Sequence, residues 1–252
     1  MKLKKIAEII EKEFPLSDAY DWDNCGLLIG DENRDIKTVL LALDVTEDAV
    51  LQAKKAGAEL ILSHHPLIFG GVKRITSESS EGRIITGLIR NNISAYAAHT
   101  NCDRGKNGIN AYLAELFELE GAEPLEEDGL GRYGDLKKEL CFSELCELTK
   151  DKLKTPFLRV CGKEGAKIGR LAVASGACSE SIPTAIRKGC DAIITGDIKY
   201  HQMLDYENGE ICIIDAGHYP TEAVVTEIFE KLLSGYGLTL VKAESSDVFR
   251  LV

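Results

Sequence analysis

Short apolar runs alternate along the chain with segments in which apolar residues recur every three or four positions. The runs predict strands, and the helical spacing between them predicts helices. Strands are expected over residues 38–44, 60–63, 93–98, 157–160, 171–174, 192–195, 211–215 and 238–242. Helices are expected over 6–14, 47–56, 83–90, 108–117, 142–153, 182–188 and 221–233. This order is typical of βα units and predicts an α/β fold with a largely parallel sheet.

The alternation is interrupted between residues 118 and 133. Glutamates and Asp128 mix there with three glycines and Pro124, a composition typical of loops. We therefore place a domain junction in this stretch.

Length and composition limit the class of protein. The chain has 252 residues and is 44% hydrophobic, enough for one large or two modest domains. No run approaches the roughly 18 apolar residues of a membrane span, and the basic start leads into an acidic amphipathic helix instead of a signal peptide. The eight cysteines are dispersed without a Cys-x-x-Cys pair and are interpreted as reduced thiols. We expect a cytoplasmic protein with no membrane segment.

Charge narrows the choice of partner. The formal net charge is −11, and the sequence displays no basic face. The charge therefore disfavours sequence-independent binding of nucleic acid, because the chain as a whole repels polyanions. A small-molecule substrate or a protein partner fits the charge better.

All five histidines lie in four short clusters, each of which follows a predicted strand. Because the carboxyl ends of parallel strands meet at one edge of an α/β sheet, side chains that follow several strands are brought together there. Imidazoles and carboxylates are the donors that divalent metal ions require. The residues that the clusters supply are His64, His65, His99, Asp103, His201, His218 and Glu222.

Each cluster taken alone also has an ordinary explanation. Neighbours on extended backbone point to opposite sides, so His64 and His65 fit two ions better than one. Asp103 alone could be a turn or cap residue, and Glu222 alone a first-turn carboxylate favoured by the helix dipole. Their recurrence at three strand ends favours a two-ion site of the kind that activates water.

Other segments leave alternatives open. The segment 195–201 mixes a carboxylate, an amine, a phenol and an imidazole, which suits substrate handling, but a helix capped by Asp197 explains it equally well. The segment 175–179 could bind an anion through its backbone N–H groups, although an ordinary βα turn is the default. The segments 23–27 and 44–46 are either turns or part of the same rim.

The order and spacing of five segments resemble the NIF-three-like family, often labelled "GTP cyclohydrolase 1 type 2 homologue". They are Asp23-Asn24-Cys25-Gly26-Leu27, Ser63-His64-His65-Pro66-Leu67, His99-Thr100-Asn101-Cys102-Asp103, Thr195-Gly196-Asp197-Ile198-Lys199-Tyr200-His201 and Gly217-His218-Tyr219-Pro220-Thr221-Glu222. The likeness covers nearly the whole chain and is to the shorter bacterial form, without the large central insertion of some relatives.

The resemblance implies two α/β domains of the NIF-three-like type, with the C-terminal segment returning to the first. We accordingly expect a first domain over 1–125, completed by 210–252, and a second over 126–209. It also implies a dinuclear metal centre between them and a ring-shaped homo-oligomer, often a hexamer.

The resemblance further assigns roles to residues. It implies two divalent metal ions per chain, of iron, manganese or zinc, held by His64, His65, Asp103, His218 and Glu222. His99 and His201 match residues near the centre and are candidates for proton transfer or for support of the ligands. The segment 175–179 holds one glycine where many relatives hold more, which puts phosphate binding there in doubt.

Two functions follow as hypotheses. The first is a dinuclear-metal-dependent hydrolase acting on a small, nucleotide-like substrate, as the family label suggests. The alternative is a non-catalytic metal-binding or metal-delivery protein, or an oligomeric interaction platform. An open coordination position favours catalysis, whereas saturated ligand shells favour storage or transfer.

Overall fold

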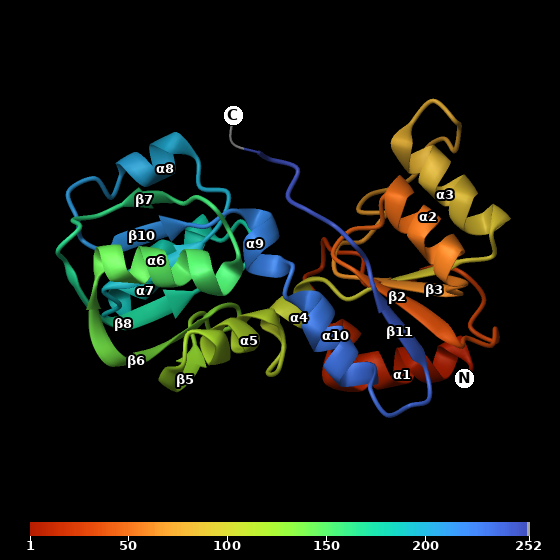
Figure 1. Cartoon of the computed structure of the whole chain (residues 1–252), viewed down its shortest axis with the longest axis horizontal. Coiled ribbons are helices and arrows are strands. Elements are labelled where there is room, and N and C mark those ends of the chain that lie inside the picture. The colour runs from red at the N-terminus through yellow and green to blue at the C-terminus, as the bar shows by residue number, and fades with distance from the viewer. Residues whose placement is uncertain (251–252) are drawn as a thin grey trace. The chain divides into compact units, whose positions relative to one another are not determined.

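The computed structural model describes residues 1–250 and divides the chain into two compact units (Figure 1). Unit 1 comprises Met1–Cys102 and Val225–Ser246. Unit 2 comprises Asp103–Val224 and the described residues from Asp247 onward. Each unit has its own sheet, so the predicted pair of α/β domains is confirmed.

Unit 1 contains a five-stranded sheet in the order β1-β4-β3-β2-β11. The strands β2, β3 and β4 run parallel, β11 is parallel to β2, and β1 is antiparallel to β4. The strand bounds are β1 Gly26–Ile29, β2 Thr38–Ala42, β3 Leu60–Ser63, β4 Ser94–Ala97 and β11 Thr239–Lys242.

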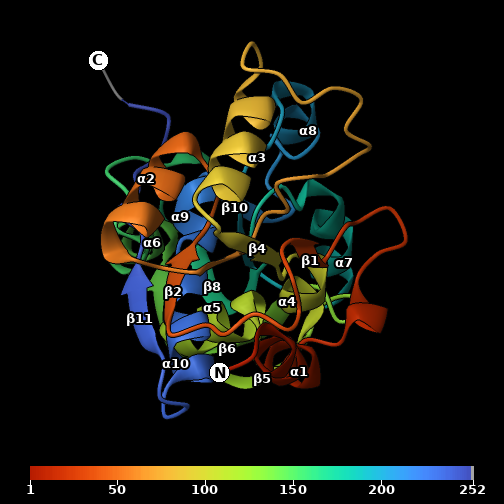
Figure 2. The ribbon, with the colours of Figure 1, turned by 90° about the vertical axis from the view of Figure 1, so that its right-hand side faces the viewer.

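Helices cover both faces of this sheet. Helices α2 (Glu47–Ala56) and α3 (Ser80–Arg90) lie on one face, where their apolar residues form a core with Leu40 and Ala42 of β2. Figure 2 shows α1 (Leu3–Glu13) and α10 (Val225–Leu233) on the opposite face. Since both faces are buried, the strands are continuous apolar runs, which is why the sequence pattern located β2, β3 and β4 well.

Unit 2 contains a six-stranded sheet in the order β5-β6-β8-β9-β10-β7. Only the central strands β8, β9 and β10 run parallel, and the other three pairings are antiparallel. The bounds are β5 Leu119–Pro124, β6 Arg132–Cys141, β7 Arg159–Cys161, β8 Lys167–Val173, β9 Ala192–Thr195 and β10 Cys212–Asp215.

Helix α7 (Ile182–Arg187) packs its apolar residues on β8, β9 and β10. Helices α5 (Ile109–Leu116) and α6 (Phe142–Leu153) contact β6 and β8. The remaining short helices are η1 Leu16–Asp18, α4 Thr100–Arg104, η2 Ser179–Ser181, α8 Tyr200–Leu204 and α9 His218–Glu222. Within residues 1–250, no helix has the length and apolar character needed to cross a membrane.

The unit boundaries differ from the expected ones. Residues 103–124 belong to unit 2, because β5 pairs with β6 of the second sheet. Residues 212–215 also belong there, because β10 pairs with β9, and only Val225–Ser246 returns to unit 1. The expected segment 210–252 ends with two residues that lie outside the described part of the chain.

The stretch 118–133, expected as a junction, is instead the hairpin of β5 and β6. Its connection contains Gly129 and Gly131, both at positive φ, as tight turns require. The second sheet is consequently mixed and not largely parallel. The sequence pattern missed β5 and β6 because much of each strand is exposed and charged.

Candidate metal centre

In unit 1, candidate donors follow three neighbouring parallel strands. Asp44 follows β2, His64 and His65 follow β3, and His99 follows β4. The backbone N–H groups of His64 and His65 donate to the carbonyls of Ala42 (3.2 Å) and Leu43 (2.9 Å), which keeps the two strand ends together. The carboxyl edge of this parallel trio is thus the place where the side chains gather, as predicted.

The three imidazoles of unit 1 converge. One ring nitrogen from each of His64, His65 and His99 lies within 4.8 Å of the others, and the ring centroids are 5.0–5.5 Å apart. The expectation that His64 and His65 point to opposite sides is therefore wrong. Strand β3 ends at Ser63 and the two histidines lie in the bend beyond it, where the alternation of extended backbone no longer applies. His99, expected near the centre, is itself in the donor group.

Each ring is oriented through its Nδ1 atom. Nδ1 of His64 lies 2.8 Å from the carbonyl oxygen of Ala98, that of His65 lies 2.7 Å from Asp44 Oδ1, and that of His99 lies 2.9 Å from Asp23 Oδ1. A metal-ligating histidine commonly donates its second ring N–H to a carbonyl or carboxylate in this way. The pattern makes Nε2 the ligand atom of all three rings.

Asp23 holds the His99 region in place. Its carboxylate accepts hydrogen bonds from Thr100 N (3.1 Å), Thr100 Oγ1 (2.5 Å) and Cys25 Sγ (3.1 Å). Burial alone would raise the pKa of Asp23, but hydrogen bonds from His99, Thr100 and Cys25 outweigh it and hold the pKa well below its usual value. Burial raises the pKa of Cys25 to about 12, so its thiol stays protonated and acts as a donor.

In unit 2, two buried carboxylates and one imidazole gather. Nε2 of His218 lies 2.9 Å from Glu222 Oε2, one helical turn away on α9. An oxygen of Glu222 lies within 4.8 Å of one of Asp103, and these carboxylates are only 4% and 8% exposed. Buried like charges repel each other strongly, and a bound cation stabilises such an arrangement.

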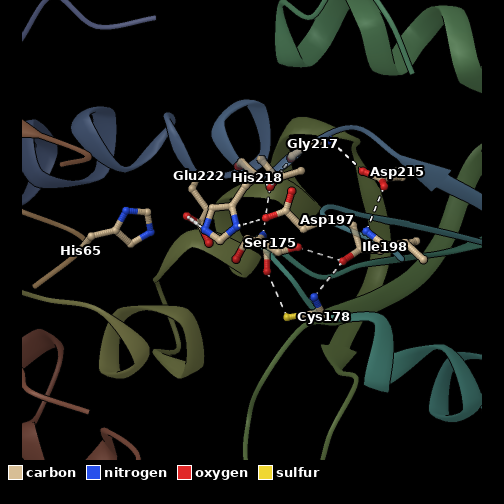
Figure 3. A network of polar contacts seen from close by, with 12 residues as sticks. His65, Ser175, Cys178, Asp197, Ile198, Asp215, Gly217, His218 and Glu222 are labelled. Atoms are coloured by element: carbon tan, nitrogen blue, oxygen red, sulfur yellow. Dashed lines mark hydrogen bonds and ion pairs between the residues drawn. The ribbon is translucent and has the colours of Figure 1, made fainter. Parts of the chain in front are cut away.

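His218 is oriented like the histidines of unit 1. Its Nδ1 lies 2.9 Å from Oδ2 of Asp197. Figure 3 marks the contact between these two side chains with a dashed line. Asp215 fixes the loops that carry this pair: it accepts hydrogen bonds from the N–H groups of Ile198 and Gly217, both 3.0 Å, and forms an ion pair with Arg159. Asp197 has φ of 53° and lies outside α8, so it does not cap that helix.

Glycines let the loops after β8, β9 and β10 approach each other closely. A Cβ atom on Gly176, whose φ is +65°, would lie 2.1 Å from Oε1 of Glu222. A Cβ atom on Gly196 would lie 2.6 Å from the carbonyl carbon of Gly217. Any other residue at Gly176 would therefore displace the Glu222 carboxylate.

The segment 175–179 is an ordinary βα turn in its hydrogen bonding. The N–H of Ser175 donates to Asn110 Oδ1 (2.8 Å), that of Gly176 to Thr221 Oγ1 (3.0 Å) and that of Cys178 to Thr195 Oγ1 (3.3 Å). These groups serve the fold, which argues against an anion cradle. Burial, with the nearby charges of Asp103 and Glu222, raises the pKa of Cys178 far above its usual value, so this thiol stays protonated.

His201 lies elsewhere in unit 2. It is exposed on α8, with its ring 5.3 Å from that of Tyr200, and no three-residue donor group among residues 1–250 includes it. Its predicted role in proton transfer stays a prediction. Asp197 was considered from the sequence as part of a substrate-handling segment or as a helix cap, and its contact with His218 was not foreseen. Asp215, which holds the neighbouring loops, was not singled out, because its role depends on loop backbone that no motif displays.

The donor chemistry of both units fits a divalent metal ion. Imidazole nitrogens and carboxylate oxygens are ligands that divalent metal ions take in proteins. The structure therefore contains groups of histidine, aspartate and glutamate that can hold a metal ion.

Comparison with known proteins identifies relatives along the full length. The family model Duf34/NIF3 (NGG1p interacting factor 3) matches residues 1–247. A protein named "GTP cyclohydrolase 1 type 2 homolog" from Clostridium perfringens is 37% identical over 100% of both chains, and one of the same name from Clostridium acetobutylicum is 36% identical, covering 93% of this chain and 90% of that protein.

Solved structures agree. Staphylococcus aureus hypothetical protein SA1388 superposes with a TM-score of 0.94 at 28% identity, covering 100% of this chain and 99% of that one. Reduced HcgD from Methanocaldococcus jannaschii superposes with a TM-score of 0.85 at 34% identity, covering 96% and 97%. Because the family model matches residues 1–247 and full-length relatives are 36–37% identical, the chain belongs to the Duf34/NIF3 family.

Proposed function

We propose that this protein is a divalent-metal-dependent hydrolase that acts on a small, nucleotide-like substrate. One observation carries the proposal. Four histidines, His64, His65, His99 and His218, each have Nδ1 within 2.7–2.9 Å of an oxygen acceptor. A core histidine also needs a hydrogen-bond partner. Four histidines held through the same ring atom, three of which converge through a ring nitrogen, fit metal ligands, which need the ring and its tautomer fixed.

The residues divide the work of such a site. Divalent metal, when bound, lowers the pKa of water and polarises a carbonyl or phosphoryl oxygen. The imidazoles of unit 1 would hold a metal ion as neutral ligands, and Asp44 and Asp23 hold two of their rings in position. Asp103 and Glu222 would supply negative charge that offsets the charge of a bound cation.

The nucleotide-like substrate is proposed from the names of the relatives, which refer to GTP. Nothing in the donor chemistry selects guanine. Two expectations stay predictions: that the donors of both units bind the same two ions, and that the protein forms a ring-shaped hexamer. The first is tested by measuring the metal content of variants that lack donors in only one of the two units. The second is tested by analytical sedimentation.

The experiment is turnover by the purified protein, loaded in turn with manganese, iron or zinc, against a panel of nucleotides and phosphoesters. The test variant combines His64→Ala with Glu222→Ala. The control is Glu147→Ala, whose side chain is 74% exposed on α6. We expect at least one substrate whose turnover is retained by the control and lost in the double variant.

Identical rates in wild type and double variant for every substrate would contradict a metal-dependent hydrolase. Absence of turnover together with rapid transfer of bound metal to a chelator would instead support the metal-delivery alternative.

A further inference from the structure

Two exposed aromatic side chains lie beside the imidazoles of unit 1. Trp22 is 58% exposed and Phe69 is 56% exposed, and their ring centroids are 5.7 Å apart. The centroids of Trp22 and Phe69 lie 6.3 Å and 6.2 Å from that of His99. Single exposed apolar residues are common on protein surfaces, but a pair of large rings against a candidate metal ligand is not explained by that background.

Contacts within unit 1 hold these two rings in place, although their apolar surface remains exposed to solvent. Tyr20 stacks on Trp22 with centroids 5.4 Å apart and an angle of 20° between the ring planes. Asn24 Nδ2 donates to the carbonyl of Ile68 (2.5 Å), which ties the Trp22 loop to the Phe69 loop. Tyr20 N donates to Thr100 Oγ1 (3.1 Å), beside His99. The rings are therefore positioned before any ligand arrives, which lowers the entropic cost of binding.

We propose that Trp22 and Phe69 form a stacking surface for a planar heteroaromatic ring, so that the substrate of this site carries such a ring next to the bond that is cleaved. The inference rests on the proposed function and assigns recognition of the ring of its substrate to Trp22 and Phe69. Stacking on an aromatic side chain tolerates any base, because every base has a π-face. The surface thus selects a ring and not a particular base.

The chain provides a direct reporter, because Trp22 is its only tryptophan. Fluorescence of metal-loaded protein is excited at the red edge of indole absorption, where nucleobases do not absorb. The probes are guanosine 5′-monophosphate, adenosine 5′-monophosphate and, as the ring-free control, ribose 5-phosphate. We expect both nucleotides to quench Trp22 and ribose 5-phosphate to leave its emission unchanged.

Equilibrium dialysis with the same probes gives affinities that do not depend on fluorescence. Trp22→Leu and Phe69→Leu should each weaken nucleotide binding roughly fivefold to a hundredfold, the range for loss of one stacking partner. Trp22→Tyr should retain most of the affinity. The matched control is Tyr236→Leu, another exposed aromatic of unit 1, which should change nothing.

Several results would overturn the inference. The first is that ribose 5-phosphate binds as tightly as the nucleotides. The second is that Trp22→Leu leaves nucleotide affinity unchanged. The third is that neither nucleotide binds at millimolar concentration. A Trp22→Leu variant that changes oligomeric state but not nucleotide affinity would assign the surface to contact between copies of the chain instead.

Metal content of the same samples separates this inference from the proposed function. If the protein binds metal but no nucleotide, the proposal of a stacking surface is wrong and the proposal of a metal-dependent hydrolase is unaffected. If the protein binds nucleotide through Trp22 but holds no metal, the proposal of a metal-dependent hydrolase is wrong and the ring-binding surface is supported.

Discussion

The two units build their candidate donor sets in the same place but by different means. Each gathers its side chains near the carboxyl ends of three parallel strands, β2, β3 and β4 in unit 1 and β8, β9 and β10 in unit 2. Unit 1 presents three imidazoles, two of them held by carboxylates. Unit 2 presents two buried carboxylates and one imidazole on the short helices α4 and α9, and glycines let the neighbouring loops pack closely against Glu222 and the start of α9.

The difference shows two ways in which an α/β unit can fix the orientation of its candidate metal-binding side chains. In unit 1 carboxylate side chains orient two of the three rings, so replacement of one aspartate should loosen one ring. In unit 2 the position of Glu222 depends on close packing against the backbone at Gly176, so an added methyl group should displace this carboxylate. Substitutions chosen for each means therefore test the comparison separately.

The largest effect is expected at Gly176. Replacement by alanine puts a Cβ atom 2.1 Å from Glu222 Oε1 and forces an L-residue into φ of +65°. The backbone cost is about 1–2 kcal/mol, and the displaced neighbour adds about 1–3 kcal/mol. Urea unfolding should show the sum, and calorimetry should show weaker metal binding.

Gly189→Ala is the matched control, since Gly189 has φ of +73° but no atom within 4 Å of an added Cβ. It should show the backbone cost alone, with metal binding intact. Equal losses in the two variants would mean that close packing at Gly176 does not position Glu222.

Asp23→Asn should show the next effect, with a dependence on pH. Because the folded state lowers the pKa of Asp23, its contribution to stability is present above the pKa of an unfolded aspartate, about 3.9, and is lost as pH falls through the folded-state pKa. Hydrogen bonds to a charged group contribute about 1.5–3 kcal/mol. Urea unfolding should therefore show a gap between wild type and variant that is widest near neutral pH and narrows in acid.

The control is Asp21→Asn, an exposed neighbour, which should lower stability little at any pH. A gap for Asp23→Asn that stays constant down to about pH 2 would contradict the role assigned to its charge.

Asp44→Asn should have the smallest effect on folding, because the Asp44 side chain is 51% exposed. It removes the charged partner of His65 Nδ1, so metal affinity should fall roughly tenfold to a hundredfold, as for other carboxylates that orient a ligating histidine. Calorimetric titration measures the change. Asp48→Asn, an exposed carboxylate on α2, should leave the affinity unchanged, and equal affinities in both variants would contradict the comparison.

The sequence predicted the buried parts of the fold better than the exposed parts. Helix α6 was predicted at Phe142–Leu153 and the strands β3 and β9 at their observed bounds, because apolar spacing determines them. Strands β5 and β6 were missed, since charged, exposed residues interrupt their alternation. Because β5 and β6 were missed, the first domain was expected to extend to residue 125, whereas the first segment of unit 1 ends at Cys102. Strand pairing decides which sheet a segment joins, and β5 pairs with β6.

The candidate site shows the same division. The sequence supplied the histidines and carboxylates, because their position after apolar strands is a local signal. The close approach of His64 and His65 depends on a bend that begins one residue after β3. The contact between Asp197 and His218 joins two loops that are far apart in the sequence and depends on the left-handed backbone of Asp197 itself. Spacing along the chain does not encode this conformation.

Element analysis of the protein as isolated tests the central claim most directly, with wild type compared against the His64→Ala, His65→Ala double variant. The account predicts roughly two divalent ions per chain in wild type and their loss in the variant, with the content retained in His201→Ala, a histidine outside the donor groups. Equal metal content in wild type and the double variant, or a wild-type protein that binds no divalent metal even at saturating concentration, would contradict it.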